Sequence, residues 1–212
     1  MKKPKYIIFD CDGVLIDSEI LANRVEAETK TELGFPITIE EQIKKFVGMG
    51  ISHPGMQEEL KRLPPHYLDL VDQKMKQVYK SELQAISGTV NALESLNIPK
   101  CVASSSEPEW LDIKLSLTNL KKYFGDSIFH GKLVSKCKPE PDLFLFVLKK
   151  LEWSASDCLV VEDSVYGVQA GRAAGLRVCG FLGGAHILPG HSERLTKAGA
   201  DYLISDLKDL RL

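Results

Sequence analysis

The sequence predicts an α/β fold in which helices flank a parallel sheet and an all-helical segment is inserted near the start of the chain. Three observations support this prediction. Several short apolar runs lack polar alternation, which is typical of strands buried on both faces of a parallel sheet. Helical patterns separate most of these runs from about residue 88 onward, and strand signals are missing between about Ser18 and Ser87.

Strands and helices are expected to alternate in the second part of the chain. The first strand is Tyr6–Phe9, and later apolar runs span residues 101–103, 127–129, 158–161, 178–181 and 202–204. One helix begins after Pro139-Glu140-Pro141, since proline is tolerated in a first turn, and another runs from Ser164 to Gly175. This alternation predicts a Rossmann-like core.

The segment between the first two strands is expected to form helices only. Thr38-x-x-Glu41 has the pattern of a capping box, Gly48 is a suitable helix stop, and Pro64-Pro65 separates two further helical stretches. We therefore predict two domains. Residues 1–17 and 87–212 form an α/β core, and residues 18–86 form a helical cap.

The composition excludes several classes of function. The 212 residues are 44% hydrophobic and 26% charged, as in ordinary globular proteins. Lys and Arg number 27 against 29 Asp and Glu, and a formal charge of -2 gives no field that would hold nucleic acid or an anionic membrane. No apolar stretch reaches the roughly 18 residues of a membrane span, and we expect neither a signal peptide nor an anchor.

The cysteines and the surface pattern bear on compartment and assembly. The five cysteines are scattered and include no C-x-x-C pair, which favours a reducing cytoplasm over a disulfide framework. No heptad or long exposed apolar stripe indicates an interface, so the oligomeric state is left open, with a monomer favoured.

Two aspartates directly follow the first expected strand. In an extended segment, residues two apart project to the same side, so Asp10 and Asp12 should converge, while Gly13 allows the backbone to turn sharply. The carboxyl ends of strands are where α/β sheets bind ligands. An aspartate in this position can also simply start a turn or cap a helix, so the pair alone does not decide the function.

Three later segments place polar or charged side chains at or near the ends of other strands. Ser104 and Ser105 follow the second strand and could bind an anion, but a serine in this position can also be present simply as the cap of the next helix. Lys138 precedes the proline-initiated helix, where an exposed surface lysine is the alternative. Glu162 and Asp163 end the most apolar strand, and a helix cap would need only one acid.

In order and in spacing, these four motifs resemble those of the haloacid dehalogenase-like superfamily: D-x-D-G-[TV]-L-x-D-S, a Ser after the second strand, K-P-x-P, and [VE]-E-D-S. The similarity covers essentially the whole chain. It is strongest to the branch with a four-helix cap, which contains β-phosphoglucomutase and phosphoglycolate phosphatase. The start of the chain is also similar to the 6-phosphogluconate phosphatase type.

The resemblance implies a phosphatase acting on a small phosphorylated substrate, either a sugar phosphate or a sugar-acid phosphate. It makes Asp10 the nucleophile that becomes an aspartyl phosphate, and Asp12 the general acid and base. Ser104, Ser105 and Lys138 would hold the phosphate oxygens. We also hypothesise that neighbouring negative charge raises the pKa of Asp12.

Formal charges indicate a metal ion. Asp10, Asp12, Glu162 and Asp163 bring about -4 against +1 from Lys138, before a phosphate dianion arrives. The candidate ligands are carboxylate or carbonyl oxygens, which select a hard ion such as Mg²⁺. The resemblance assigns the ion to Asp10, the main-chain oxygen of Asp12 and Asp163, with Glu162 beside them or bound.

Three other functions fit the sequence less well than a phosphatase does. A β-phosphoglucomutase-type mutase would carry a His in the first cap helix and an Arg after the second, where this chain offers Ala22 and Gly50-Ile51. A dehalogenase would need neither Asp12 nor Asp163, and a catalytically silent binding protein would not need every motif residue.

The segment from Gly48 to Gly55 is expected to be a specificity loop or an ordinary turn, with His53 a candidate contact. The other histidines, His186 and His191 among them, are expected to be solvated or in the core.

Overall fold

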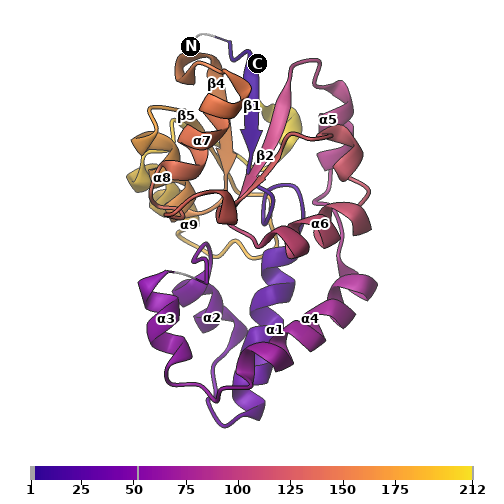
Figure 1. The fold of residues 1–212 in the computed structure, drawn as a ribbon, viewed down its shortest axis with the longest axis vertical. Helices are drawn as coiled ribbons and strands as arrows, with labels where there is room; N and C mark the ends of the chain where they lie inside the picture. Colours follow the sequence, from indigo (N-terminus) through magenta and orange to yellow (C-terminus); the bar gives the residue numbers. More distant parts are fainter. Residues whose placement is uncertain (1–2, 52, 212) are drawn as a thin grey trace.

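A computed structural model describes residues 3–51 and 53–211 (Figure 1). Six parallel strands form one sheet in the order β3-β2-β1-β4-β5-β6. They are β1 (Tyr6–Phe9), β2 (Lys100–Ser104), β3 (Ile128–His130), β4 (Cys158–Glu162), β5 (Arg177–Phe181) and β6 (Tyr202–Ile204). The predicted α/β class with a parallel, Rossmann-like sheet is confirmed, and the strand order reverses at β1, where such sheets form a ligand crevice.

Helices cover both faces of the sheet. Ile7 and Phe9 of β1 belong to one hydrophobic cluster with α5 (Thr89–Ser95) and α6 (Pro108–Leu117). Ile8 belongs to the opposite cluster, which includes residues of α7 (Asp142–Leu151), α8 (Val165–Ala173) and α9 (His191–Ala198). Because successive side chains of a strand point to opposite faces, a fully apolar strand such as β1 is stable only between two helical layers. Four short 3-10 helices span Lys121–Tyr123, Gly131–Leu133, Ala155–Asp157 and Leu207–Asp209.

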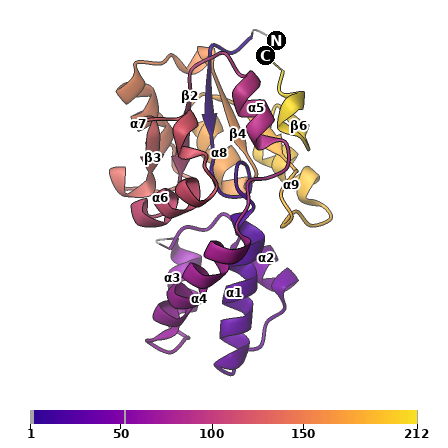
Figure 2. The same ribbon diagram turned by 90° about the vertical axis from the view of Figure 1, so that its right-hand side faces the viewer.

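Four helices lie between β1 and α5 in the sequence, beyond the carboxyl end of β1 (Figures 1 and 2). They are α1 (Ser18–Glu32), α2 (Ile39–Phe46), α3 (Pro54–Leu60) and α4 (Tyr67–Glu82). Side chains of α1 and α4 form a hydrophobic cluster of their own around Leu21, Val25, Met75 and Tyr79. The capping box at Thr38 and Glu41 is present, and α2 ends at Phe46, with Val47 as its C-cap and Gly48 directly after it at φ +79°.

The two connections between the sheet and this helical segment lie side by side. The Asp17 amide donates to the Gln84 carbonyl at 3.0 Å, and the Ile86 amide donates to the Leu15 carbonyl at 3.0 Å. Both connections therefore lie directly beside the turn that follows β1. In the part of the chain described by the structure, no helix is long and apolar enough to cross a bilayer.

Candidate active site

The turn after β1 carries the two aspartates. The Asp10 amide donates to the Val161 carbonyl at 3.0 Å, which extends the pairing of β1 with β4 by one residue. Gly13 follows with φ +76°, and a Cβ built there would meet Asp163 Oδ2 at 2.2 Å. Glycine is thus needed at this position for both backbone conformation and space.

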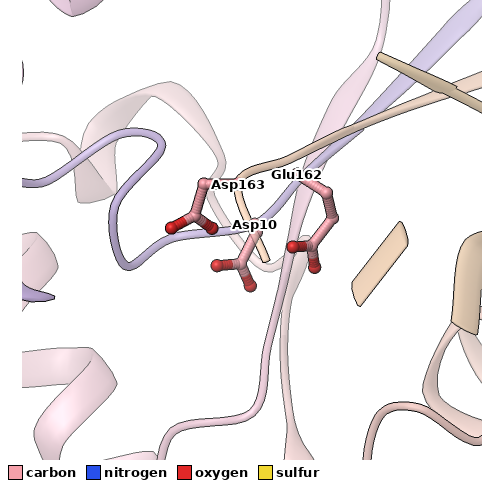
Figure 3. A group of neighbouring side chains, drawn as sticks. All are labelled: Asp10, Glu162 and Asp163. Carbon is pink, nitrogen blue, oxygen red and sulfur yellow. The ribbon is translucent and has the colours of Figure 1, made fainter. Parts of the chain in front are cut away.

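Three carboxylates and a lysine meet at the carboxyl ends of β1 and β4. One oxygen from each of Asp10, Glu162 and Asp163 lies within 4.8 Å of the others, and all three side chains are buried. Figure 3 shows the Asp10 carboxylate between those of Glu162 and Asp163. Lys138 Nζ donates to Asp10 Oδ1 at 2.7 Å, to Glu162 Oε1 at 2.5 Å and to the Ala103 carbonyl at 3.0 Å. These four sequence-predicted site residues are brought together.

The electrostatics of this group leave negative charge uncompensated. Burial raises the pKa of Asp10, Lys138 opposes that rise, and Glu162 and Asp12 add to it, so that the pKa of Asp10 is about 7. Burial and then the charge of Asp10 also raise the pKa of Asp163 well above its ordinary value. Three buried carboxylate oxygens in reach of one point, with a single ammonium group beside them, fit a hard divalent cation.

Asp12 points away from this cluster toward α6. Its carboxylate accepts hydrogen bonds from the hydroxyl groups of Ser18 at 2.5 Å, Ser106 at 2.8 Å and Ser104 at 3.2 Å, and from the Lys114 ammonium group. Burial alone would raise the pKa of Asp12, but Lys114 and then these hydroxyl groups lower it to about 2. The expectation that neighbouring negative charge raises this pKa is therefore wrong.

Lys114 is a residue of the site that the motifs did not indicate. It is 4% exposed, on the buried face of α6 beside Leu111 and Leu115. The site therefore holds two lysines rather than the one that the charge count assumed. A lysine between two apolar positions on the core face of a helix is the signal that could have revealed it, because buried lysines are rare without a partner.

The serine segment after β2 lies at the same edge of the sheet. Ser104 is fully buried, and its hydroxyl group accepts from the Ser106 amide at 3.1 Å while donating to Asp12. Ser105 lines the cavity in front of Asp10. The two serines predicted to bind phosphate are thus beside the aspartates, and Ser104 contacts Asp12 directly.

Two histidines from the segment that follows β5 flank Asp163. His186 Nε2 lies 2.8 Å from Asp163 Oδ2, although neither ring nitrogen makes a well-aligned hydrogen bond. His191 Nε2 lies 2.5 Å from the Asp163 carbonyl oxygen. Both rings are buried, so of the two expected placements, solvated or in the core, the structure has the second. The spacing of these histidines in the sequence gave no indication of contact with a site residue.

A cavity of about 510 Å³ connects this group to the helical segment. Its core wall includes Asp10, Asp12, the serines, Lys114 and Lys138. The opposite wall comes from α1, α4 and the α2–α3 loop, and includes Ala22 and residues 48–51. His53 is not among the described residues that line the cavity. Its ring accepts a hydrogen bond from the Gly55 amide and packs against Tyr166.

Comparison with known proteins agrees with this architecture. The profile of the haloacid dehalogenase-like hydrolases matches residues 7–181. The chain is 30% identical over 197 residues to 6-phosphogluconate phosphatase of Escherichia coli, covering 89% of this chain and 87% of that protein. It is 31% identical over 206 residues to the phosphorylated carbohydrates phosphatase of Thermotoga maritima, covering 93% of each.

A solved structure of a haloacid dehalogenase-like protein from Agrobacterium tumefaciens superimposes with a TM-score of 0.85 at 40% identity, covering 97% of this chain and 95% of the other. The fold, the order of the motifs and the family profile agree over most of the sequence. The chain belongs to the haloacid dehalogenase-like hydrolase family.

Proposed function

We propose that the protein is a Mg²⁺-dependent phosphatase that hydrolyses a small phosphorylated metabolite, a sugar phosphate or sugar-acid phosphate, through a phosphorylated Asp10. One observation carries the proposal. Asp10 lies at the carboxyl end of β1, bonded to Lys138 and beside two further acids, on the floor of a cavity large enough for such a substrate. The phosphatases among its relatives support the same reaction.

In the first step an Asp10 oxygen attacks phosphorus, and the bond from phosphorus to the leaving alcohol breaks. Asp12 donates a proton to the departing oxygen. In the second step Asp12 removes a proton from water, the water oxygen attacks phosphorus, and the bond to Asp10 breaks, releasing phosphate. Lys114 and the hydroxyl groups of Ser18 and Ser106 hold free Asp12 as a carboxylate, so it takes up its proton from solvent once the substrate dianion adds negative charge nearby.

The side chains around Asp10 provide the remaining functions. Lys138 and Ser105 bind the nonbridging phosphate oxygens, and Ser104 assists through its hydroxyl group while orienting Asp12. A Mg²⁺ ion would be held by Asp10, Asp163 and the main-chain oxygen of Asp12, with Glu162 beside them or bound. When bound, it neutralises charge on the phosphate oxygens.

Residues 18–86 are proposed to act as a cap domain on a core formed by residues 1–17 and 87–212. The cap helices cover the cavity and would exclude water during transfer. The cap side of the cavity carries Ala22 and Gly50-Ile51 where a mutase of the β-phosphoglucomutase type would carry a His and an Arg. The absence of those groups from the described wall supports hydrolysis over intramolecular phosphate exchange.

The test is hydrolysis of p-nitrophenyl phosphate with Mg²⁺ or after treatment with a chelator, beside Asp10→Asn. We expect turnover by the wild type only with the metal, and none by Asp10→Asn at equal folded concentration. A panel of sugar monophosphates follows, with phosphate release and isomeric products both measured. Wild-type inactivity with Mg²⁺ on every compound would refute the phosphatase, and an isomeric sugar phosphate without release of phosphate would identify a mutase.

The protein is further proposed to be a cytoplasmic monomer. None of its five cysteines forms a disulfide, which supports a reducing compartment. Sedimentation equilibrium tests the assembly, since a monomer gives 23.6 kDa at all concentrations.

A further inference from the structure

The cap wall of the cavity carries several acids in a regular pattern. On α1, Glu19, Asn23 and Glu26 lie at positions i, i+4 and i+7, so they share one face of the helix, and all three line the cavity. On α4, Asp69 and Asp72 lie one turn apart and also line it. Two helices thus present carboxylate oxygens toward the side on which the leaving group of a substrate bound at Asp10 would lie.

Positive charge is missing from this wall. The cationic side chains among the described lining residues are Lys114 and Lys138, and both belong to the core side. Lys138 is bonded to Asp10 and Glu162, and Lys114 to Asp12. Neither ammonium group is available to a leaving group in the cap half of the cavity.

Lys30 and Lys76 of the cap are already paired with other side chains. Lys30 donates to Gln42 Oε1 at 2.9 Å and to Glu59 Oε1 at 3.0 Å and does not line the cavity. Lys76, which is 59% exposed, pairs with Asp72 at 2.6 Å. The Asn23 amide donates to the carbonyl and carboxylate oxygens of Glu19 at 2.8 and 3.2 Å. What the wall offers a ligand is therefore mainly acceptor oxygens.

Most of the remaining wall is apolar. Met49, Met56, Leu68, Val71 and Met75 line it, together with Tyr79 of α4, whose ring packs edge-on against Trp110 of α6. Acceptor oxygens set among apolar side chains match a molecule that presents hydroxyl donors together with C–H faces. Burial raises the pKa of Glu26 to about 7 and that of Glu19 to about 8, so above these values a carboxylate or a second phosphate would instead face like charge. That juxtaposition is strongly unfavourable away from bulk water.

We propose that the substrate carries its phosphate on a neutral, hydroxyl-rich leaving group of the sugar or sugar-alcohol type, and that the acids of α1 and α4 disfavour leaving groups bearing a second negative charge. This inference rests on the proposed phosphatase function. It narrows that function, because it sets sugar-acid phosphates and bisphosphates aside.

The test compares three six-carbon monophosphates that differ in the oxidation state of C1: D-glucitol 6-phosphate, D-glucose 6-phosphate and 6-phosphogluconate. At a pH above 8, where Glu19 and Glu26 are ionised, we expect kcat/KM for the carboxylate compound to be lower than for glucitol 6-phosphate by about tenfold or more, since like charges repel. In Glu26→Gln combined with Asp72→Asn, the ratio of the two values should move toward one by several-fold. Glu58→Gln is the matched control, because Glu58 is exposed on α3 and pairs with Lys61 and Arg62.

The outcomes separate the two proposals. Failure to hydrolyse, with Mg²⁺ present, any sugar phosphate of the panel or p-nitrophenyl phosphate refutes the phosphatase itself. Hydrolysis of that compound with 6-phosphogluconate preferred, or with none of the three sugar compounds turned over, refutes the substrate class and leaves the phosphatase standing. An unchanged ratio in the double variant refutes the role of these acids.

Discussion

The Lys114 ammonium group donates a hydrogen bond to the Asp12 carboxylate, and both side chains are largely withdrawn from solvent. Burial alone would lower the pKa of Lys114, but the Asp12 charge raises it above its ordinary value. The contact joins the turn after β1 to α6, at the edge of the sheet where the reaction is proposed. It also holds the Asp12 side chain apart from the Asp10, Glu162 and Asp163 group.

Replacing Lys114 with Met should therefore lower both activity and stability. We expect kcat on p-nitrophenyl phosphate to fall by about 10²-fold, because Asp12 loses the group that orients it. The loss of one partner also leaves a buried charge, which costs about 3–5 kcal/mol of unfolding free energy. Steady-state kinetics and urea unfolding measure the two effects. Lys121→Met is the control, since Lys121 is exposed and pairs with Asp112, and wild-type kcat in Lys114→Met would contradict this role.

Gly167→Ala should disturb the acidic group through packing alone. A Cβ at Gly167 would lie 1.9 Å from Glu162 Cδ, so the Glu162 side chain must move. At Gly171, one turn later on α8, a Cβ would instead meet Val178 Cγ2 at 2.7 Å. We expect both variants to lower the melting temperature and only Gly167→Ala to raise the Mg²⁺ concentration needed for half-maximal activity. Equal metal responses in the two variants would count against the contact with Glu162.

His186→Asn should weaken metal binding without touching the nucleophile. Partners that orient a metal-binding carboxylate contribute about 10–100-fold in affinity, and His186 Nε2 lies 2.8 Å from Asp163 Oδ2. The expected result is a rise of that size in the Mg²⁺ concentration for half-maximal activity, and a smaller thermal shift on adding Mg²⁺. His66→Asn provides the control at an exposed position. An unaltered metal response would remove His186 from the site.

Glu26 makes stability depend on pH. Burial raises the pKa of Glu26 to about 7, so between about pH 4.5 and 7 the folded chain binds more protons than the unfolded chain. Its contribution to stability is therefore present at low pH and lost as the pH rises through that range. Relative to wild type, Glu26→Gln should have similar stability at pH 5 and gain about 2 kcal/mol at pH 8, a figure reduced for the partial exposure of the side chain. Urea unfolding at several pH values tests this, and parallel pH curves for the two proteins would contradict it.

The strands of the sheet, and the position of the motif residues at strand ends, could be predicted because the sequence signals for both are local. A run such as Tyr6–Phe9 has no polar face, and the residues that follow it must turn, so the position of Asp10 at a strand end follows from a few neighbouring residues. The capping box at Thr38 and Glu41 is equally local, and it formed as predicted.

The contacts that local patterns could not reveal join distant segments. Asp12 and Lys114 are 102 residues apart, and their contact depends on how α6 is rotated against the sheet. His186 reaches Asp163 from an irregular segment after β5, where no periodicity fixes the direction of a side chain. The direction of the Asp12 pKa was wrong for the same reason, since it depends on a lysine that only the fold brings into contact.

Ser18 is the first residue of α1, and its hydroxyl group donates to Asp12 at 2.5 Å. One of the donors that hold the acid thus comes from the helical segment, while the acid itself follows β1. A chimera that exchanges helical segments between relatives would disturb Asp12 if its junction removed this serine. The helical segment can therefore be exchanged without loss of this contact only if the junction lies after Ser18, within the first turn of α1.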